Sequence, residues 1–136
     1  MNKLEYIPGD IVKIEYGEAT GKIGFVTNTF LRRKGCYSLV VFIGKGFQGS
    51  SKDDWIQTYN DEVSPIPLTP EILKKNGWEK LYEKFFEKNV NNIRLTIELS
   101  ENIYVAINRI FIMEIHYIHE LQHLLFGLGI NHKMEV

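Results

Sequence analysis

Short runs of alternating hydrophobic and polar residues fill the first 66 positions of the chain, and glycines separate them. Val12, Ile14 and Tyr16 alternate with polar neighbours, which is the period-two pattern of a half-buried strand. Further apolar runs that read as strands lie at 25–30, 37–43 and 55–59. Several short strands joined by turns predict a small antiparallel β-barrel.

Prolines at positions 65, 67 and 70 mark a boundary between a lobe of residues 1–66 and a lobe of residues 67–136. Thr69 is suited to be a helix N-cap, Pro70 fits the first helical position, and Gly77 supplies a left-handed stop. The sequence therefore predicts a short helix over residues 70–76.

The rest of the second lobe reads as a β-meander closed by a helix. The charged and aromatic residues of 79–88 do not decide between a helix and an extended segment. Residues 93–99 alternate cleanly, and a tight turn leads to a strand at 103–107 and a third extended segment at 110–112. The last helix is expected to begin near Met113 and to end at Gly127 and Gly129. The predicted class is α+β: a small barrel, a helix, a meander and a C-terminal amphipathic helix.

Composition narrows the range of functions. The 136 residues include 44% hydrophobic and 24% charged residues, with a net charge of −1, so the chain lacks the basic excess of a strong nucleic-acid binder. One cysteine, Cys36, excludes an internal disulfide framework. No secretion signal is visible, and no apolar run approaches the roughly 20 residues that span a bilayer. The expected setting is cytoplasmic, without a membrane partner.

The glycine pattern of the first lobe resembles a known motif. Gly9-Asp10 opens the first strand, and Gly17, Gly21-Lys22 and Gly24 follow in a Gly-x-x-x-Gly-Lys-x-Gly turn. About 20 residues here resemble the KOW motif of ribosomal proteins and transcription factors. This resemblance implies an SH3-like barrel whose strand-joining loops contact RNA or a protein partner.

Basic residues in the loops of this lobe are the candidate nucleic-acid contacts, because Lys and Arg bind phosphates independently of base sequence. These candidates are Lys22, Arg32, Arg33, Lys34 and Lys45. The alternative is that they are solvated loop charges on a scaffolding barrel.

Residues 44–49 spell Gly-x-Gly-x-x-Gly after an apolar strand. A dinucleotide site requires a helix at this point, whereas turn and strand residues follow here, so a hairpin loop is the better interpretation. A backbone nest that holds a phosphate stays open as an alternative, since Lys45 and Lys52 flank the loop.

His119-Glu120-Leu121-Gln122-His123 spells the pentapeptide of zinc peptidases. Two histidines at i and i+4 share one helix face and bind zinc, and the glutamate between them activates the bound water. The alternative function is therefore a zinc-dependent hydrolase that uses His119 and His123 as ligands and Glu120 as base.

The surroundings of this pentapeptide argue against zinc. A helical wheel puts His116, His119 and His123 on the polar face and Leu121 and Leu125 near the centre of the apolar face. A core-packing helix with a solvated polar stripe explains the pattern. Catalytic zinc needs a third protein ligand, and the chain offers none at the spacing of the known classes. No cofactor is therefore expected.

The second lobe resembles another family. Residues 65–73 followed by Gly77-Trp78, together with the ending at 118–126, resemble a family of small uncharacterised proteins from Bacteroidetes genomes, prophages and phages. Those relatives usually end in Tyr-Val-His-Gln-Leu-Gln-Asn, which lacks the glutamate and the second histidine. The resemblance implies a phage or prophage setting and no zinc chemistry.

Together these features favour a non-enzymatic binding protein. Its expected ligand is nucleic acid or a nucleotide-like anion, with a host protein as the second choice. A phage antagonist of host defence, which binds a host protein or sequesters a nucleotide signal, is a further alternative.

Overall fold

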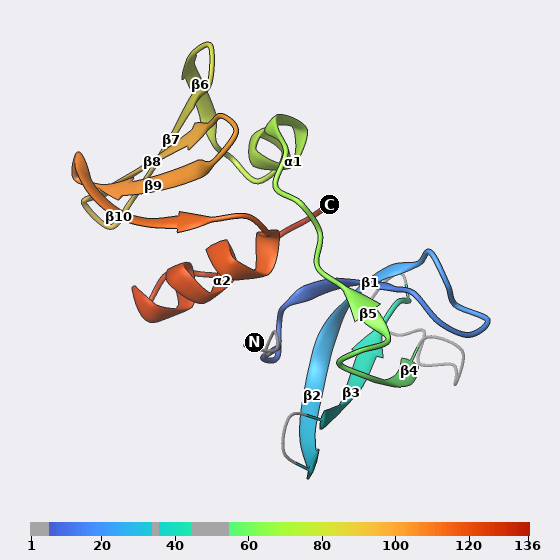
Figure 1. Cartoon of the computed structure of the whole chain (residues 1–136). Coiled ribbons are helices and arrows are strands. Elements are labelled where there is room, and N and C mark those ends of the chain that lie inside the picture. The colour runs from blue at the N-terminus through green and yellow to red at the C-terminus, as the bar shows by residue number, and fades with distance from the viewer. Residues whose placement is uncertain (1–5, 34–35, 45–54) are drawn as a thin grey trace. The chain divides into compact units, whose positions relative to one another are not determined.

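The structure of this protein is a computed structural model that describes residues 6–33, 36–44 and 55–136 (Figure 1). The chain divides into two compact units, Met1–Ile66 and Pro67–Val136, called here the N-terminal unit and the C-terminal unit. Both units are built mainly from antiparallel sheet and the two helices belong to the second, in agreement with an α+β class. Among the described residues, no helix has the length and apolar character required to cross a membrane.

The N-terminal unit is a five-stranded antiparallel sheet. Its strands are β1 (Ile11–Ile14), β2 (Ile23–Arg33), β3 (Cys36–Phe42), β4 (Trp55–Tyr59) and β5 (Val63–Ser64). They lie in the order β4-β3-β2-β1-β5, so the short last strand returns to pair with the first. The four strands expected from alternation are confirmed, with β2 longer than its apolar run. The sheet is open, with β4 and β5 at its edges, so barrel closure is not present among the described residues.

The β1–β2 turn requires its glycines for two different reasons. Gly17 and Gly21 have φ of 89° and 91°, a backbone region that favours glycine. Gly24 instead lies against β3, where a Cβ atom would overlap the carbonyl oxygen of Phe42. Positive φ and close backbone approach are the two properties expected of these positions.

Asp10 fixes the entry to β1. Its side chain is fully buried, and its Oδ2 accepts a hydrogen bond of 2.9 Å from the backbone N–H of Ile7. The backbone of Asp10 also accepts from the N–H of Val26, at 2.8 Å. A local hydrogen bond to Oδ2 thus holds this polar side chain next to the core and offsets part of its desolvation.

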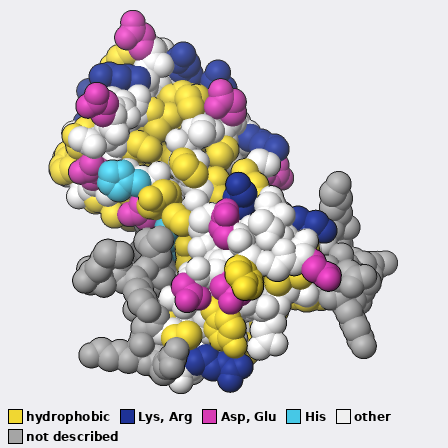
Figure 2. Space-filling view, turned by 45° about the vertical axis from the view of Figure 1, so that its right-hand side comes forward, with side chains coloured by type: hydrophobic (Ala, Val, Ile, Leu, Met, Phe, Trp, Pro, Cys, Tyr) yellow, Lys and Arg dark blue, Asp and Glu magenta, His cyan; other side chains and the backbone are white. Residues whose placement is uncertain are grey.

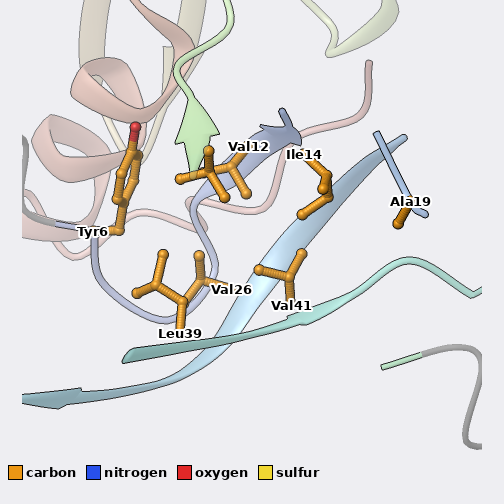
Figure 3. Close-up of a cluster of buried hydrophobic side chains, with 8 residues drawn as sticks. Tyr6, Val12, Ile14, Ala19, Val26, Leu39 and Val41 are labelled. Atoms are coloured by element: carbon orange, nitrogen blue, oxygen red, sulfur yellow. The ribbon is translucent and has the colours of Figure 1, made fainter. Parts of the chain in front are cut away.

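Branched side chains from β1, β2 and β3 form the core of the N-terminal unit (Figure 3). Val12, Ile14, Val26, Leu39 and Val41 have no measurable exposure. Val12 and Ile14 alternate with exposed Lys13, as the sequence pattern predicts. The pattern is wrong for Tyr16, which lies beyond the end of β1 and is 71% exposed. One face of this sheet is therefore a packed core, and the other is free to carry function.

In the C-terminal unit, α1 (Pro70–Lys75) follows the predicted helix closely. The Oγ1 atom of Thr69 accepts a hydrogen bond of 3.3 Å from the backbone N–H of Ile72, so Thr69 is the N-cap. Gly77, with φ of 86°, ends the turn after the helix.

A second antiparallel sheet follows in a simple meander. Its strands are β6 (Glu79–Tyr82), β7 (Phe85–Val90), β8 (Ile93–Leu99), β9 (Ile103–Ile107) and β10 (Ile110–Ile115), in the order β10-β9-β8-β7-β6. The undecided stretch 79–88 is therefore a β-hairpin. The expected strands at 93–99 and 103–107 are confirmed, and the third extended segment is longer than expected.

The last helix, α2 (Ile118–Gly127), begins five residues later than Met113, so the predicted start is wrong. Residues 113–115 complete β10 instead, where Ile115 is fully buried. The Oε1 atom of Glu120 accepts from the backbone N–H groups of His116 and Tyr117, at 2.9 and 3.1 Å. This cap fixes the first turn of the helix at its observed position.

The buried residues of the second sheet all point to one side, called here its inner face. They are Phe86, Leu95, Ile97, Val105 and Ile115. Lys88 shares that side, and its Nζ donates to the carbonyl oxygen of Asn76 at the end of α1, 2.9 Å away. The apolar sides of α1 and α2 supply further buried side chains, and Leu68, Trp78 and Ile130 are buried outside the helices. Within this unit the opposite face of the sheet is accessible, and Tyr82 and Phe111 on it are 64% and 60% exposed.

Candidate functional site

Five aromatic side chains share the outward face of β2, β3 and β4, opposite the core of the N-terminal unit. Phe25, Phe42 and Trp55 lie directly across from one another on the three strands. Phe30 and Tyr59 flank Ser38 two outward rows further along, beyond the row of Asn28, Val40 and Gln57. The name aromatic face is used here for these five: Phe25, Phe30, Phe42, Trp55 and Tyr59.

A bulge in β2 brings these rings to one side. Phe25 and Phe30 are five positions apart, so a regular strand would point them to opposite faces. The pairing register shifts between Val26 and Asn28, and the intervening Thr27 donates its hydroxyl to the carbonyl oxygen of Val40 at 3.1 Å. The extra residue turns Phe30 to the side of Phe25.

Three of the rings are in contact with one another, and the rings are accessible. Ring centroids of Phe25 and Phe42 are 5.4 Å apart, and those of Phe42 and Trp55 are 4.7 Å apart. Phe25 and Trp55 remain 43% and 40% exposed, and Phe30 is 53% exposed. Large aromatic side chains in water on a folded sheet are the surfaces on which planar ligands stack.

Polar side chains lie among the rings. Asn28 and Gln57 flank Val40 on the same outward side, one row from Phe42. Gln57 donates its Nε2 to the hydroxyl of Ser38 over 3.4 Å. Amide and hydroxyl groups beside aromatic rings can hydrogen-bond the edges of stacked bases.

The predicted cations are only partly placed by the structure. Lys22 precedes β2 and Arg32 lies near its end, and both side chains are exposed. The backbone of Arg33 belongs to β2, while its side chain, with Lys34, Lys45 and Lys52, lies outside the described residues. At about 3.3 Å per residue, the 11 residues of β2 span roughly 35 Å, so Lys22 and Arg32 lie at opposite ends of the strand.

A surface hollow of about 380 Å³ adjoins one end of the aromatic face. It is lined by Arg32, Cys36, Tyr59, Asp61 and Glu62. The hollow beside Tyr59 is thus lined by a positively charged donor, Arg32, and by two acidic residues, Asp61 and Glu62. Such a mixture suits the edge of a heterocycle better than it suits a bare phosphate.

Charges are mixed by sign on the face of the molecule drawn in Figure 2, where Lys and Arg side chains are scattered among Asp and Glu side chains and hydrophobic ones. This distribution matches the even charge balance of the sequence. Affinity for a polyanion therefore needs a contribution beyond electrostatics.

The pentapeptide at 119–123 has structural roles in α2. His119 is only 2% exposed, so the expectation of a solvated histidine stripe is wrong at this position. Its ring stacks on Tyr117, with centroids 5.9 Å apart, and meets the ring of His123 at 5.5 Å. Glu120 caps the helix with the carboxylate oxygen that a zinc peptidase would aim at water.

Gln122 shows why the polar face of α2 is covered. It is fully buried, and its Nε2 donates to the carbonyl oxygen of His132 over 2.9 Å. The segment after the helix thus folds back against α2 and covers part of its polar side. In the described ranges, no three or more His, Cys, Asp or Glu side chains are grouped to hold a metal ion.

Sequence reasoning missed the aromatic face, because alternation alone assigns Phe25 and Phe30 to opposite sides. It also did not identify Lys13 as a basic residue of the outward side. Lys13 is opposite Ile23 in the β1–β2 pairing, and its Nζ lies 3.8 Å from Oε1 of Glu15. The three cross-strand aromatic positions were visible only as separate apolar runs.

No protein-family model, no curated protein and no solved structure matches this chain.

Proposed function

We propose that this protein is a non-enzymatic binding protein whose aromatic face binds single-stranded nucleic acid. The observation that carries the proposal is the exposed ring cluster of Phe25, Phe42 and Trp55, with Phe30 and Tyr59 two rows away on the same side of the sheet. Base–aromatic stacking contributes about 1–3 kcal/mol per base and tolerates any sequence.

Base stacking can contribute the binding free energy that the balanced charge of the chain does not provide. A net charge of −1 gives weak general attraction to a polyanion. Two or three stacked bases would contribute several kcal/mol without any excess of cations. Arg32, which lines the hollow beside Tyr59, would then contact a phosphate of a bound strand, and Lys22 would add positive charge at the other end of β2.

The proposal includes an SH3-like architecture of KOW type for the N-terminal unit. The strand order β4-β3-β2-β1-β5 supports it, since the last strand pairs with β1. The glycine turn supports it too, through positive φ at Gly17 and Gly21 and close packing at Gly24. The proposed setting is a phage or mobile element inside a cell, supported by the likeness of residues 65–78 and 118–126 to phage and prophage proteins.

Removing one ring should weaken binding measurably. Phe25→Ala and Trp55→Ala are each expected to lower the affinity for single-stranded DNA or RNA homopolymers by about 1–3 kcal/mol, roughly 5- to 150-fold. Fluorescence anisotropy of a labelled oligonucleotide at low salt measures the loss. Phe126→Ala is the matched control, because that ring is 60% exposed on α2 in the other unit.

Tryptophan fluorescence gives a second readout at the site itself. Trp55 lies on the aromatic face and Trp78 is 3% exposed in the C-terminal unit, so Trp78→Phe leaves one reporter. Stacked bases should quench Trp55 in this variant. If the wild-type chain binds neither single-stranded DNA nor RNA at low salt, the proposed function is wrong.

The cations should act on all sequences alike. Replacing Arg32, Arg33 and Lys34 together with alanine should weaken binding uniformly across homopolymers. Each lost phosphate contact on a single strand lowers the log–log salt slope by about 0.7, so the triple variant should lose about 2. A salt slope equal to that of the wild type would show that these side chains are solvated charges.

A further inference from the structure

A row of side chains crosses the open face of the C-terminal sheet, opposite α1 and α2. Tyr82, Phe85, Glu98, Tyr104 and Glu114 are direct cross-strand neighbours on β6, β7, β8, β9 and β10. Direct neighbours in an antiparallel sheet point to the same side. One carboxylate, that of Glu98, therefore stands between two aromatic residues, Phe85 and Tyr104.

The spacing of this row suits a cation. Neighbouring strands are about 4.8 Å apart, so the side chains of Phe85 and Tyr104 leave the sheet about 10 Å from each other, with Glu98 midway. A cation on the Glu98 carboxylate would lie about 5 Å from each ring, within the range of a cation–π contact. Each ring is held by a second one: Phe85 by Tyr82 at 5.0 Å and Tyr104 by Phe111 at 5.7 Å.

The charge of the open face points to the same class of ligand. Its glutamates are Glu79, Glu87, Glu98 and Glu114. Arg94, on β8, is a basic residue of the same face, and its Nε lies 2.8 Å from Oε1 of Glu87. Glu79 is directly opposite Glu87, an unfavourable pairing of like charges. A positively charged partner would reduce this excess of negative charge, whereas a nucleic acid would increase it.

Lys84 already shows that the row accepts a cation. Its Nζ lies 3.6 Å from Oε2 of Glu98, and the two side chains are 48% and 30% exposed. Ser100 also donates its hydroxyl to Oε2, at 3.3 Å. An exposed ion pair of this kind contributes at most about 1 kcal/mol, so a partner's cation can displace Lys84 from the carboxylate.

We propose that this open face binds an arginine-bearing segment of another protein, with one guanidinium placed on Glu98 between Phe85 and Tyr104. Arginine is favoured over lysine because its planar group stacks on rings and pairs with a carboxylate through two N–H donors. Glu79 and Glu114, at the two sides of the sheet, would attract further cations of the same segment. This inference concerns the C-terminal unit and does not rest on the proposed nucleic-acid face.

The test uses the full chain and a short Gly/Ser peptide that carries several arginines, with binding measured by calorimetry at low salt. Glu98→Gln should weaken binding about tenfold, since it removes the charge beneath the cation–π pair. Lys84→Ala should tighten binding, because the competing internal cation is gone. Glu101→Gln is the control: it makes the same charge change at an exposed position in the β8–β9 turn.

Peptides in which lysine or uncharged citrulline replaces arginine separate the effect of the positive charge from the effect of the planar guanidinium shape. Lysine should bind more weakly than arginine, and citrulline should not bind. Equal loss for Glu98→Gln and Glu101→Gln would show general electrostatics and overturn the assignment, as would no binding of the arginine peptide. Oligonucleotide binding should be unchanged in Glu98→Gln, so failure here is distinct from failure of the aromatic face.

Discussion

Replacing Leu121 with alanine is expected to lower the free energy of unfolding of the C-terminal unit by about 2–5 kcal/mol. Leu121 has no exposed surface, and it lies on the apolar side of α2 with Ile118 and Leu125. The change removes buried methyl groups and leaves a cavity that a helix fixed at both ends cannot close. For a domain of this size, that is a large share of the total stability.

Urea unfolding followed by the fluorescence of Trp78 measures this effect, because Trp78 is buried in the same unit. A Trp55→Phe background removes the other reporter. Phe126→Ala is the control on the same helix: its ring is 60% exposed and meets His132 edge-on, so the cost should stay below about 1 kcal/mol. Equal costs for the two variants would show that the apolar side of α2 is wrongly assigned.

The sequence predicts the apolar side of α2 but not its first residue or its covered polar side. Leu121 and Leu125 are buried, as the helical wheel requires. The wheel treats the opposite side as solvated because it contains no information about residues 128–136. In the structure Ile130 is 7% exposed, and the backbone near His132 accepts from Gln122. Burial of His119 follows from tertiary packing, which periodicity does not encode.

Where one or two residues determine the local backbone, the sequence predicts the structure correctly. Thr69, Pro70 and Gly77 define α1, because a cap, a fixed φ and a positive φ act on the backbone where they stand. Alternation likewise predicts the strands of the meander, because it reflects which side of each strand is buried. The sequence does not decide the stretch 79–88, because its first strand, β6, is exposed throughout and shows no alternation of buried and exposed positions.

Bulges place several residues of both proposed binding faces, and alternation alone does not reveal those positions. One extra residue in β2 puts Phe30 on the side of Phe25. A register shift between Phe111 and Met113 in β10 likewise places Phe111 and Glu114 on one face, although they are three positions apart. A bulge reverses the parity of every later position, so alternation misassigns the face after it. The cations, in contrast, were read from residue type alone, and Lys22 and Arg32 are exposed.

Replacing Gly24 with alanine is expected to destabilise the N-terminal unit by about 3 kcal/mol or more. Gly24 faces Val12 across β1 and β2, and a Cβ atom there would overlap the carbonyl oxygen of Phe42. It would also lie 2.8 Å from Cγ2 of Ile43 and 2.9 Å from Cγ1 of Val41. The side-chain atoms can move, but the carbonyl belongs to the β2–β3 ladder, so relief requires the two strands to separate.

The aromatic face makes this prediction a test of both fold and function, because Phe25 follows Gly24 directly and pairs with Phe42. Denaturant unfolding in the Trp78→Phe background, with Trp55 as reporter, should give a lower midpoint for Gly24→Ala and weaker oligonucleotide binding. Gly127→Ala is the matched control, since nothing lies within 4 Å of its Cβ position at the end of α2. Alanine is the better helix former by up to about 1 kcal/mol, so that variant, followed by Trp78 in the Trp55→Phe background, should be neutral or more stable. A Gly24→Ala midpoint equal to that of the parent would contradict the close approach of β2 and β3, and with it the alignment of rings on which the aromatic face depends.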